Sequence, residues 1–247
     1  MKTKPHLSNG YSLAKKTLGL YSAMQDLNRA AIKHISCIIK AGINLRDIKA
    51  LCEDYLMKNG ADSFWYWDVG AFVFAGDETS VSVSGKDYKA ANRTILENDI
   101  ITIDLSPQKD NIWGDYARTL VVENGRVCNE IGGIKKDEWR NGLQMEAYLH
   151  KTLMYMATPD MTFEELYCYM NDLIAEKGFL NLDFLGNLGH SIVKNKDNRV
   201  YIEKGNRKKL SDVEMFTFEP HVGIPDSKYG YKREDIYYFD NDKLIKL

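Results

Sequence analysis

One stretch of the sequence decides the fold class: residues 100–122, which read IITIDLSPQKDNIWGDYARTLVV. Both ends of this stretch are rich in β-branched and apolar residues, a composition typical of strands, and residues 106–111 between them read as a turn. Two strands that a turn joins lie side by side and antiparallel. Because side chains alternate between the two faces of a strand, Asp104 and Asp115 can converge on one face.

Two amphipathic helices are predicted before this stretch. Apolar residues recur at spacings of three and four over residues 14–40, which is typical of a helix with one buried face. A second helix is predicted with Asn44 as its N-cap and Asn59-Gly60 at its end.

The second half of the chain repeats this order. A helix is predicted over residues 137–156, and another begins at the capping-box sequence that starts at Thr162. The step along the chain from Asn44 to Thr162 equals the step from Gly60 to Gly178, which ends the fourth helix. Strand-like runs follow each helix pair: residues 64–75 and 100–122 in the first half, and residues 215–220 and 235–239 in the second. This order predicts an α+β domain of two similar halves, with helices packed against one face of an antiparallel sheet. A chance match between amphipathic helices is the alternative.

Composition excludes several classes of protein. The 247 residues include 33 basic and 35 acidic side chains, a net charge of -2, which is not the basic excess of a nucleic-acid binder. No apolar run approaches the ~20 residues of a membrane helix, and the polar N-terminus carries no secretory signal. The scattered cysteines are typical of reduced thiols: Cys37, Cys52, Cys128 and Cys168. We therefore expect a cytoplasmic protein with one domain over residues 1–247, in which residues 1–13 are flexible or loosely attached, and no nucleic-acid or membrane partner.

Two further acidic residues sit in apolar runs near the end of the chain. Glu219 follows MFTF, and Glu234 precedes DIYYF. Four carboxylates on apolar strands repel one another unless cations lie between them, which favours a metal site. The alternative is that some of them pair with basic side chains, for which the sequence offers Arg118, Lys232 and Arg233.

Among the five histidines, His190 stands apart because glycines at positions 186 and 189 precede it and allow close approach of backbone or ligand. His34 and His150 fall within predicted helices, where packing or surface roles are expected. His221 follows Glu219-Pro220, and whether it reaches the same cleft stays open.

Together, these residues resemble the ligand set of the pita-bread metallopeptidases, a family that includes methionine aminopeptidase, Xaa-Pro aminopeptidase and prolidase. The five positions occur in the family's order and approximate spacing: Asp104, Asp115, His190, Glu219 and Glu234. The motifs around them are IDLS, GDYART, GHSI, FTFEP and RED. The resemblance runs from about residue 20 to the end. It implies the catalytic domain alone, with a pita-bread fold of two pseudo-symmetric halves and helices outside a curved antiparallel sheet.

The resemblance also implies a role for each residue. Asp104 would chelate one divalent ion, and Asp115 and Glu234 would bridge two. His190 and Glu219 would complete the second site. Mostly oxygen ligands with one imidazole suit Mn, Co, Fe or Zn. Glu219 is the family's candidate catalytic general base.

Two substrate-facing histidines of the family are missing. Residues 79–85 read TSVSVSG where the first is expected, with Ser84 as the nearest candidate for its position. At the second, the sequence places either Tyr201 or Ile202. These departures put rate and substrate class in question, whereas metal binding is unaffected.

The leading interpretation is a dinuclear metal-dependent aminopeptidase that acts on peptides with a free N-terminus, with Xaa-Pro substrates slightly favoured over Met substrates. The alternative is a peptide- or protein-binding module with a metal site and little or no peptidase activity. A creatinase-like hydrolase of a small non-peptide C–N bond fits poorly, because relatives of that kind use histidines rather than a metal centre. The aromatic run of residues 64–67 can line a specificity pocket or belong to the core. The oligomeric state stays open, and a homodimer is one candidate.

Overall fold

A computed structural model describes residues 15–247, so the expected loose segment 1–13 lies outside the described residues. The first half begins with α1 (Lys15–Ile38) and α2 (Leu45–Lys58). The side chain of Asn44 accepts a hydrogen bond from the Arg46 backbone N–H at the start of α2, and Asn59 caps its end. The capping residues predicted for this helix are therefore confirmed.

The four-stranded sheet of the first half places two acidic residues together. Its order is β2 (Ala71–Ala75), β3 (Asp99–Leu105), β6 (Tyr116–Glu123) and β7 (Arg126–Val127), with every neighbouring pair antiparallel. The register pairs Asp104 with Ala117, and Asp115 lies two residues before Ala117. The two carboxylates therefore lie on one face, as the sequence predicted.

Two of the strand predictions need correction. Residues 106–111 are not simply a turn, because β4 (Pro107–Lys109) and β5 (Ile112–Trp113) form a small sheet with β1 (Ser63–Phe64). The chain reverses only at residues 110–111, which adopt the left-handed conformation. The run 64–75 is likewise broken, since residues 67–68 have positive φ angles and separate β1 from β2.

The second half begins with α3 (Asp137–Met156) and α4 (Phe163–Glu176). A reciprocal capping box between Thr162 and Glu165 starts α4 as predicted. Two antiparallel three-stranded sheets follow, one with the order β11-β10-β8 and the other with the order β13-β12-β9. Their strands are β8 (Leu180–Asn181), β9 (Phe216–Phe218), β10 (His221–Gly223), β11 (Gly230–Lys232), β12 (Asp235–Asp240) and β13 (Lys243–Lys246).

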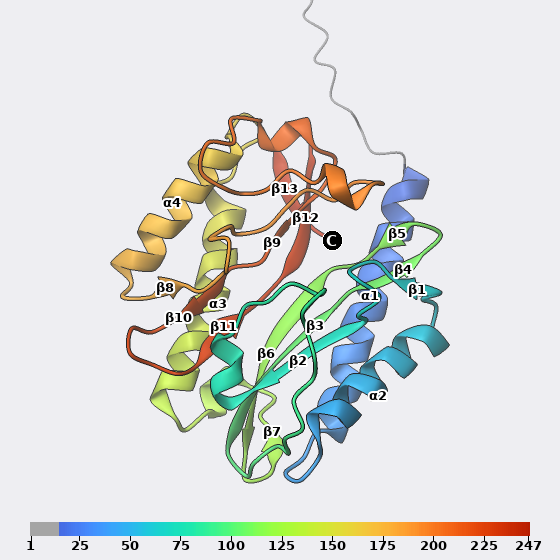
Figure 1. Cartoon of the computed structure of the whole chain (residues 1–247). Helices are drawn as coiled ribbons and strands as arrows, with labels where there is room; N and C mark the ends of the chain where they lie inside the picture. Colours follow the sequence, from blue (N-terminus) through green and yellow to red (C-terminus); the bar gives the residue numbers. More distant parts are fainter. Residues whose placement is uncertain (1–14) are drawn as a thin grey trace, which may run out of the picture.

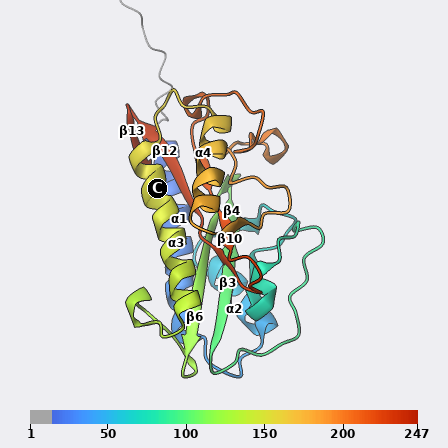
Figure 2. The ribbon, with the colours of Figure 1, turned by 90° about the vertical axis from the view of Figure 1, so that its left-hand side faces the viewer.

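The helices lie outside the strands in both halves. Figure 1 shows α1 and α2 beside the strands of the first half, and α3 and α4 beside those of the second. In Figure 2, α1 and α3 lie on one side of the long strands β3 and β6. Each half has its own buried apolar cluster, which includes Ile48, Leu56 and Ile103 in the first half and Phe163, Leu166 and Phe218 in the second. Strands β3 and β6 contribute residues to both clusters, so apolar packing covers both of their faces.

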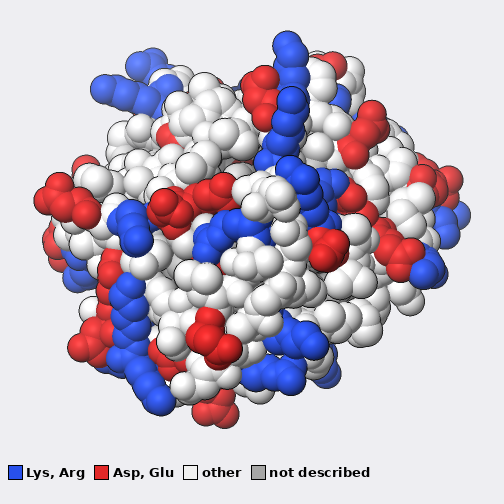
Figure 3. All heavy atoms as spheres, turned by 60° about the horizontal axis from the view of Figure 1, so that its bottom comes forward, with Lys and Arg blue, Asp and Glu red and all other residues white. Residues whose placement is uncertain are grey.

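The surface carries charges of both signs. On the face drawn in Figure 3, basic and acidic side chains are interspersed, in keeping with the net charge of -2. Within residues 15–247, no helix combines the length and the apolar character that crossing a membrane requires.

Candidate metal centre

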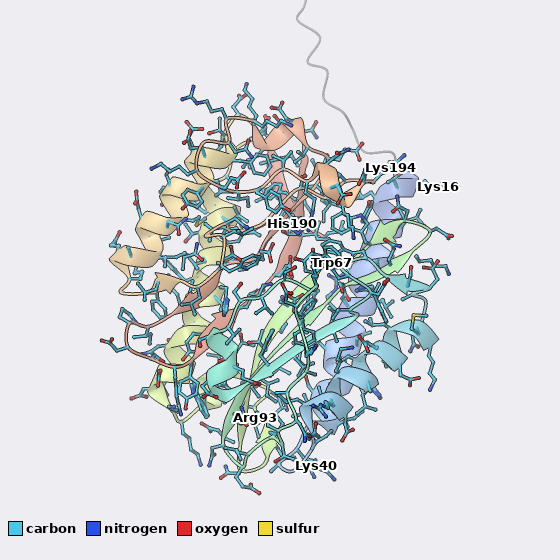
Figure 4. All side chains as sticks on the ribbon, viewed as in Figure 1. Lys16, Lys40, Trp67, Arg93, His190 and Lys194 are labelled. Carbon is cyan, nitrogen blue, oxygen red and sulfur yellow. The ribbon has the colours of Figure 1, made fainter. Side chains whose placement is uncertain are left out.

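A cleft between the two halves brings together residues that are far apart in the sequence. Asp104 lies on β3, Asp115 directly precedes β6, and Glu219 directly follows β9. Lys232, the last residue of β11, lines the same cleft. Figure 4 shows His190 near the middle of the molecule, between the two helix pairs.

The backbone around His190 explains how its ring reaches the carboxylates. Gly189 has a φ of +140°, and a Cβ at this position would collide with the carbonyl oxygen of Thr217. The Thr217 hydroxyl oxygen accepts a hydrogen bond from the His190 N–H at 3.0 Å, and the Thr217 N–H donates to the His190 carbonyl at 2.7 Å. The glycine motif therefore lets this segment pack directly against β9 and fixes the position of the imidazole.

Three of the predicted ligands form one compact group. One ligand atom from each of Asp115, His190 and Glu234 lies within 4.8 Å of the other two, and all three residues are buried. His190 Nε2 is 3.4 Å from Asp115 Oδ2 and 3.7 Å from Glu219 Oε1, which brings the fourth predicted ligand to the same ring.

Lys232 links the remaining acid to this group. Its Nζ lies 2.6 Å from Asp104 Oδ2 and 3.0 Å from Glu219 Oε2. The ion-pair alternative therefore holds for two of the four acids. The two arginines that the sequence also offered bind Asp235 instead, with Arg118 at 2.6 Å and Arg233 at 3.1 Å.

The other two acids have oxygens without partners. Within the described part of the chain, both carboxylate oxygens of Glu234 and Oδ2 of Asp115 are buried and accept no hydrogen bond. Burying an unpaired carboxylate is costly, so each of these groups needs a proton or a cation. The set of carboxylate and imidazole donors matches what Mn, Fe, Co and Zn prefer, so these residues fit a divalent metal.

Burial raises the pKa of three of the four acids. Burial raises the pKa of Glu234 well above its usual value, and the charges of Asp115, Glu219 and Asp104 raise it further. Burial also raises the pKa of Asp115 to about 6, although His190 opposes the shift. The pKa of Asp104 is raised by burial against the opposing charge of Lys232.

Glu219 differs from the other three acids. Burial disfavours its charged form, but the charges of Lys232 and His190 outweigh burial and leave its pKa below the usual value. Glu219 is therefore the acid of this group that is most readily ionised at neutral pH.

A buried network behind the cleft was missed from the sequence. The Thr119 hydroxyl donates to Glu146 on α3 at 2.6 Å and accepts a hydrogen bond from the Lys232 N–H at 2.8 Å. Arg118 Nη1 donates to the Glu234 carbonyl at 2.7 Å. These contacts fasten the backbone that carries Lys232 and Glu234 to β6. The available signal was an acidic residue on the apolar face of a predicted helix.

The structure also places the residues near the two missing histidines. Tyr201 lines the cleft, with its ring centroid 5.9 Å from that of His190, whereas Ile202 is fully buried in the apolar cluster of the second half. Of the two residues that the sequence offers for the second position, Tyr201 is therefore the one that lines the cleft. In the stretch 79–85, Ser82 and Val83 line the cleft and Ser84 is not among its lining residues, and the assignment of Ser84 to the first position stays a prediction.

Two further predictions about the cleft can be decided. His221 does reach it, and its Nε2 lies 2.7 Å from the Thr79 carbonyl oxygen. Burial and the charge of Lys232 lower the pKa of His221 to about 4, so this ring is neutral at neutral pH. In the aromatic run, Trp65 and Tyr66 line the cleft, whereas Phe64 packs against the core.

Comparison with known proteins gives a consistent result. The model of metallopeptidase family M24 matches residues 20–241. The Xaa-Pro dipeptidase of Lactobacillus helveticus is 27% identical over 132 residues, which are 53% of this chain and 33% of that protein. The methionine aminopeptidase of Helicobacter pylori is 25% identical over 209 residues, 80% of this chain and 76% of that protein.

Solved structures share the fold. The X-Pro aminopeptidase of Thermotoga maritima has a TM-score of 0.77 at 20% identity, and the match covers 96% of this chain and 62% of that one. The prolidase of Pyrococcus furiosus has a TM-score of 0.77 at 20% identity, covering 94% and 64%. This chain thus spans about a third of the dipeptidase and less than two thirds of these solved chains. The predicted pita-bread fold is confirmed.

Proposed function

The chain belongs to metallopeptidase family M24, and from that premise we propose that it is a dinuclear metal-dependent aminopeptidase built as one pita-bread domain. The observation that carries the proposal is a set of buried oxygens on Asp115 and Glu234. These oxygens lie near His190 and have no hydrogen-bond partner among the described residues. The family is metal-dependent, and a cation at this point would satisfy all three oxygens at once.

Each of the five residues has a role in this proposal. Asp104, Asp115 and Glu234 would hold one ion, and Asp115, His190, Glu219 and Glu234 would hold the second. Two ions of Mn, Co, Fe or Zn would supply Lewis-acid activation of water and stabilisation of a developing oxyanion.

Glu219 moves the proton in the proposed reaction. Its lowered pKa keeps the carboxylate ionised and able to accept a proton from the attacking water. The same oxygen then delivers that proton to the leaving nitrogen of the peptide. The contact with Lys232 keeps Glu219 in place during both transfers.

We propose a peptide with a free N-terminus as the substrate, with Xaa-Pro slightly favoured over Met at the cleaved end. Similarity to an Xaa-Pro dipeptidase and to prolidase structures supports this preference. The aromatic rings of Trp65, Tyr66 and Tyr201 offer an apolar wall against which a proline ring can pack.

One observation favours a second candidate, a binding module that holds metal and peptide without cleaving the peptide. The family resemblance implies two histidines in the cleft; residues 79–85 contain none, and Tyr201, one of the two residues offered for the second position, lines the cleft. Loss of one donor to a developing oxyanion costs about 10²–10³ in rate.

A peptide panel separates the two candidates. Protein reconstituted with Mn²⁺ or Co²⁺ is incubated with Ala-Pro, Met-Ala and their N-acetylated forms. The aminopeptidase predicts cleavage of the free-amine peptides only, and loss of cleavage after chelation. Metal uptake without cleavage of either free-amine peptide would favour the binding module.

A further inference from the structure

The ring of His221, the first residue of β10, lines the cleft in a fixed orientation. Its Nε2 lies 2.7 Å from the carbonyl oxygen of Thr79, which can only accept a hydrogen bond, so Nε2 carries the ring hydrogen. Gly230 makes room for this contact, because a Cβ there would collide with both atoms. The Gly230 N–H also donates to the Thr79 hydroxyl at 3.0 Å, which ties the two segments together.

The other ring nitrogen of His221 is left as an acceptor. Burial and the charge of Lys232 lower the pKa of the ring, so the ring carries a single proton, on Nε2. Nδ1 forms no hydrogen bond with the described residues, although the residue is only 5% exposed. The buried hydroxyl of Thr102, another residue of the cleft wall, has no partner among them either. A ligand that brings only apolar atoms here leaves both groups unpaired, which is costly.

The strand register places Thr102 away from the metal centre. Thr102 and Asp104 leave the same face of β3, and their partners on β6 are Thr119 and Ala117. Asp115 precedes Ala117 by two residues, whereas Thr119 follows it by two. Asp115 and Thr102 therefore lie on opposite sides of Asp104 along the sheet.

His221 lies on the same side as Thr102. His221 and Lys232 are direct partners in the pair of strands β10 and β11, so their side chains lie close together on one face. The Lys232 N–H donates to Thr119, the register partner of Thr102. We call the part of the cleft lined by Phe74, Thr102 and His221 the His221 side.

The two parts of the cleft fit the two sides of a cleaved peptide bond. The aromatic wall proposed for the proline ring lies near Asp115, because Trp65 Nε1 donates to the Gly114 carbonyl at 2.9 Å. The His221 side lies beyond Asp104 in the other direction. A peptide with its cleaved bond at the metal centre and its proline on the aromatic wall directs the side chain of its first residue toward the His221 side. This placement rests on the proposed function.

We propose that His221 Nδ1 accepts a hydrogen bond from the side chain of the first substrate residue, so that the protein prefers first residues with a neutral hydroxyl or carboxamide over apolar residues of the same shape. A carboxylate offers no hydrogen to Nδ1, and the ammonium of Lys232 beside the ring disfavours a cationic side chain. His221 is thereby a specificity residue. Its contact with Thr79 alone would be structural and would create no preference among peptides.

The test compares matched peptides on Mn²⁺-loaded protein: Thr-Pro with Val-Pro, and Asn-Pro with Leu-Pro. Within each pair the first side chains are similar in shape, and one of them lacks the hydrogen-bond donor. We expect kcat/KM to be about 5- to 50-fold higher for Thr-Pro and Asn-Pro than for their apolar counterparts, since the apolar side chain leaves a buried acceptor unpaired.

Two variants separate the acceptor from the structural contact. His221→Gln can still donate to the Thr79 carbonyl but has no acceptor at the position of Nδ1, so it should bring both ratios close to one. His221→Asn loses the reach to Thr79 but can place its amide oxygen near the position of Nδ1, so it should keep part of the preference. The matched control is His150→Gln, because His150 is an equally buried imidazole whose Nε2 donates to the Arg233 carbonyl at 3.0 Å and which does not line the cleft. It should keep the parent ratios, whatever its effect on the rates themselves.

Equal kcat/KM within both pairs in the parent would overturn the inference while the proposed function stands. So would a His221→Gln variant that keeps the parent ratios, or loss of the preference in His221→Asn alone. If no peptide is cleaved, the proposed function fails, and calorimetric binding of the same peptides decides the inference. Tighter binding of Thr-Pro than of Val-Pro that His221→Gln abolishes would support it, and equal binding would refute it.

Discussion

Two pairs of carboxylates meet in the cleft, and their surroundings differ. Asp104 and Glu219 share the ammonium of Lys232, at 2.6 and 3.0 Å. Asp115 and Glu234 have no such partner, and three of their oxygens accept no hydrogen bond from the described residues. The chain thus supplies a cation, Lys232, to Asp104 and Glu219, and none to Asp115 and Glu234. At Glu219 the charges of Lys232 and His190 outweigh burial and lower the pKa, whereas burial prevails at Asp104 and Glu234 and raises the pKa of both.

The largest expected effect on activity comes from Glu219, which alone among the four acids of the cleft has a lowered pKa. Glu219→Gln removes the proposed base, and we expect kcat for a free-amine peptide to fall by about 10²–10⁴. Glu234→Gln is the control from the other pair, since it should act first on metal retention. Rates and metal content measured on both variants separate the two roles. Turnover of Glu219→Gln at the parent rate would show that another group moves the proton.

The second prediction concerns a variant in which Asp104 and Glu219 lose the cation that they share. Lys232→Met leaves Asp104 and Glu219 without their cation, so the metal-free protein should lose about 3 kcal/mol of stability. The same repulsion should raise the affinity for Mn²⁺ by about tenfold, because the ion now replaces the lost charge. Chemical denaturation in chelator and calorimetric titration measure the two effects. If Mn²⁺ affinity falls instead, Lys232 acts by orienting the carboxylates rather than by competing with the ion.

An effect that vanishes at low pH concerns the network that fastens Lys232 to β6. Burial raises the pKa of Glu146 from 4.5 to about 7. The folded protein therefore keeps a proton that the unfolded chain releases, and stability is lost as the pH rises from about 4.5 through 7. Glu146→Gln still accepts the Thr119 hydrogen bond and cannot ionise. Relative to the parent, it should be similar near pH 4.5 and more stable by up to about 3 kcal/mol near pH 8. A difference that does not change with pH would contradict this assignment.

Local sequence signals were sufficient for the helices. The caps at Asn44 and Thr162 and the glycines that follow the helices define ends that depend on neighbouring residues only. The break between β1 and β2 was not predicted, because Trp67 and Asp68 adopt positive φ angles that non-glycine residues seldom show. Short strands such as β4 and β5 depend on pairing with β1, which no local pattern reveals.

The same limit applies to the site. Order and spacing predicted five ligands, and the structure places three of them, Asp115, Glu219 and Glu234, near the fourth, His190. The sequence could not choose among three possible cations, because Lys232 reaches Asp104 across 128 positions of chain. Glu146 lies on the apolar face of its helix, but its partner Thr119 comes from β6 and follows from tertiary packing alone.

Titration of Mn²⁺ into metal-free parent protein and into Asp115→Ala tests the central claim most directly, with denaturation of both proteins in chelator. We predict uptake of up to two equivalents by the parent and no tight uptake by the variant. Without metal, the variant should be the more stable of the two, because one buried carboxylate has been removed. No tight uptake by the parent, or equal uptake by both proteins, would show that these buried acids are not a metal site.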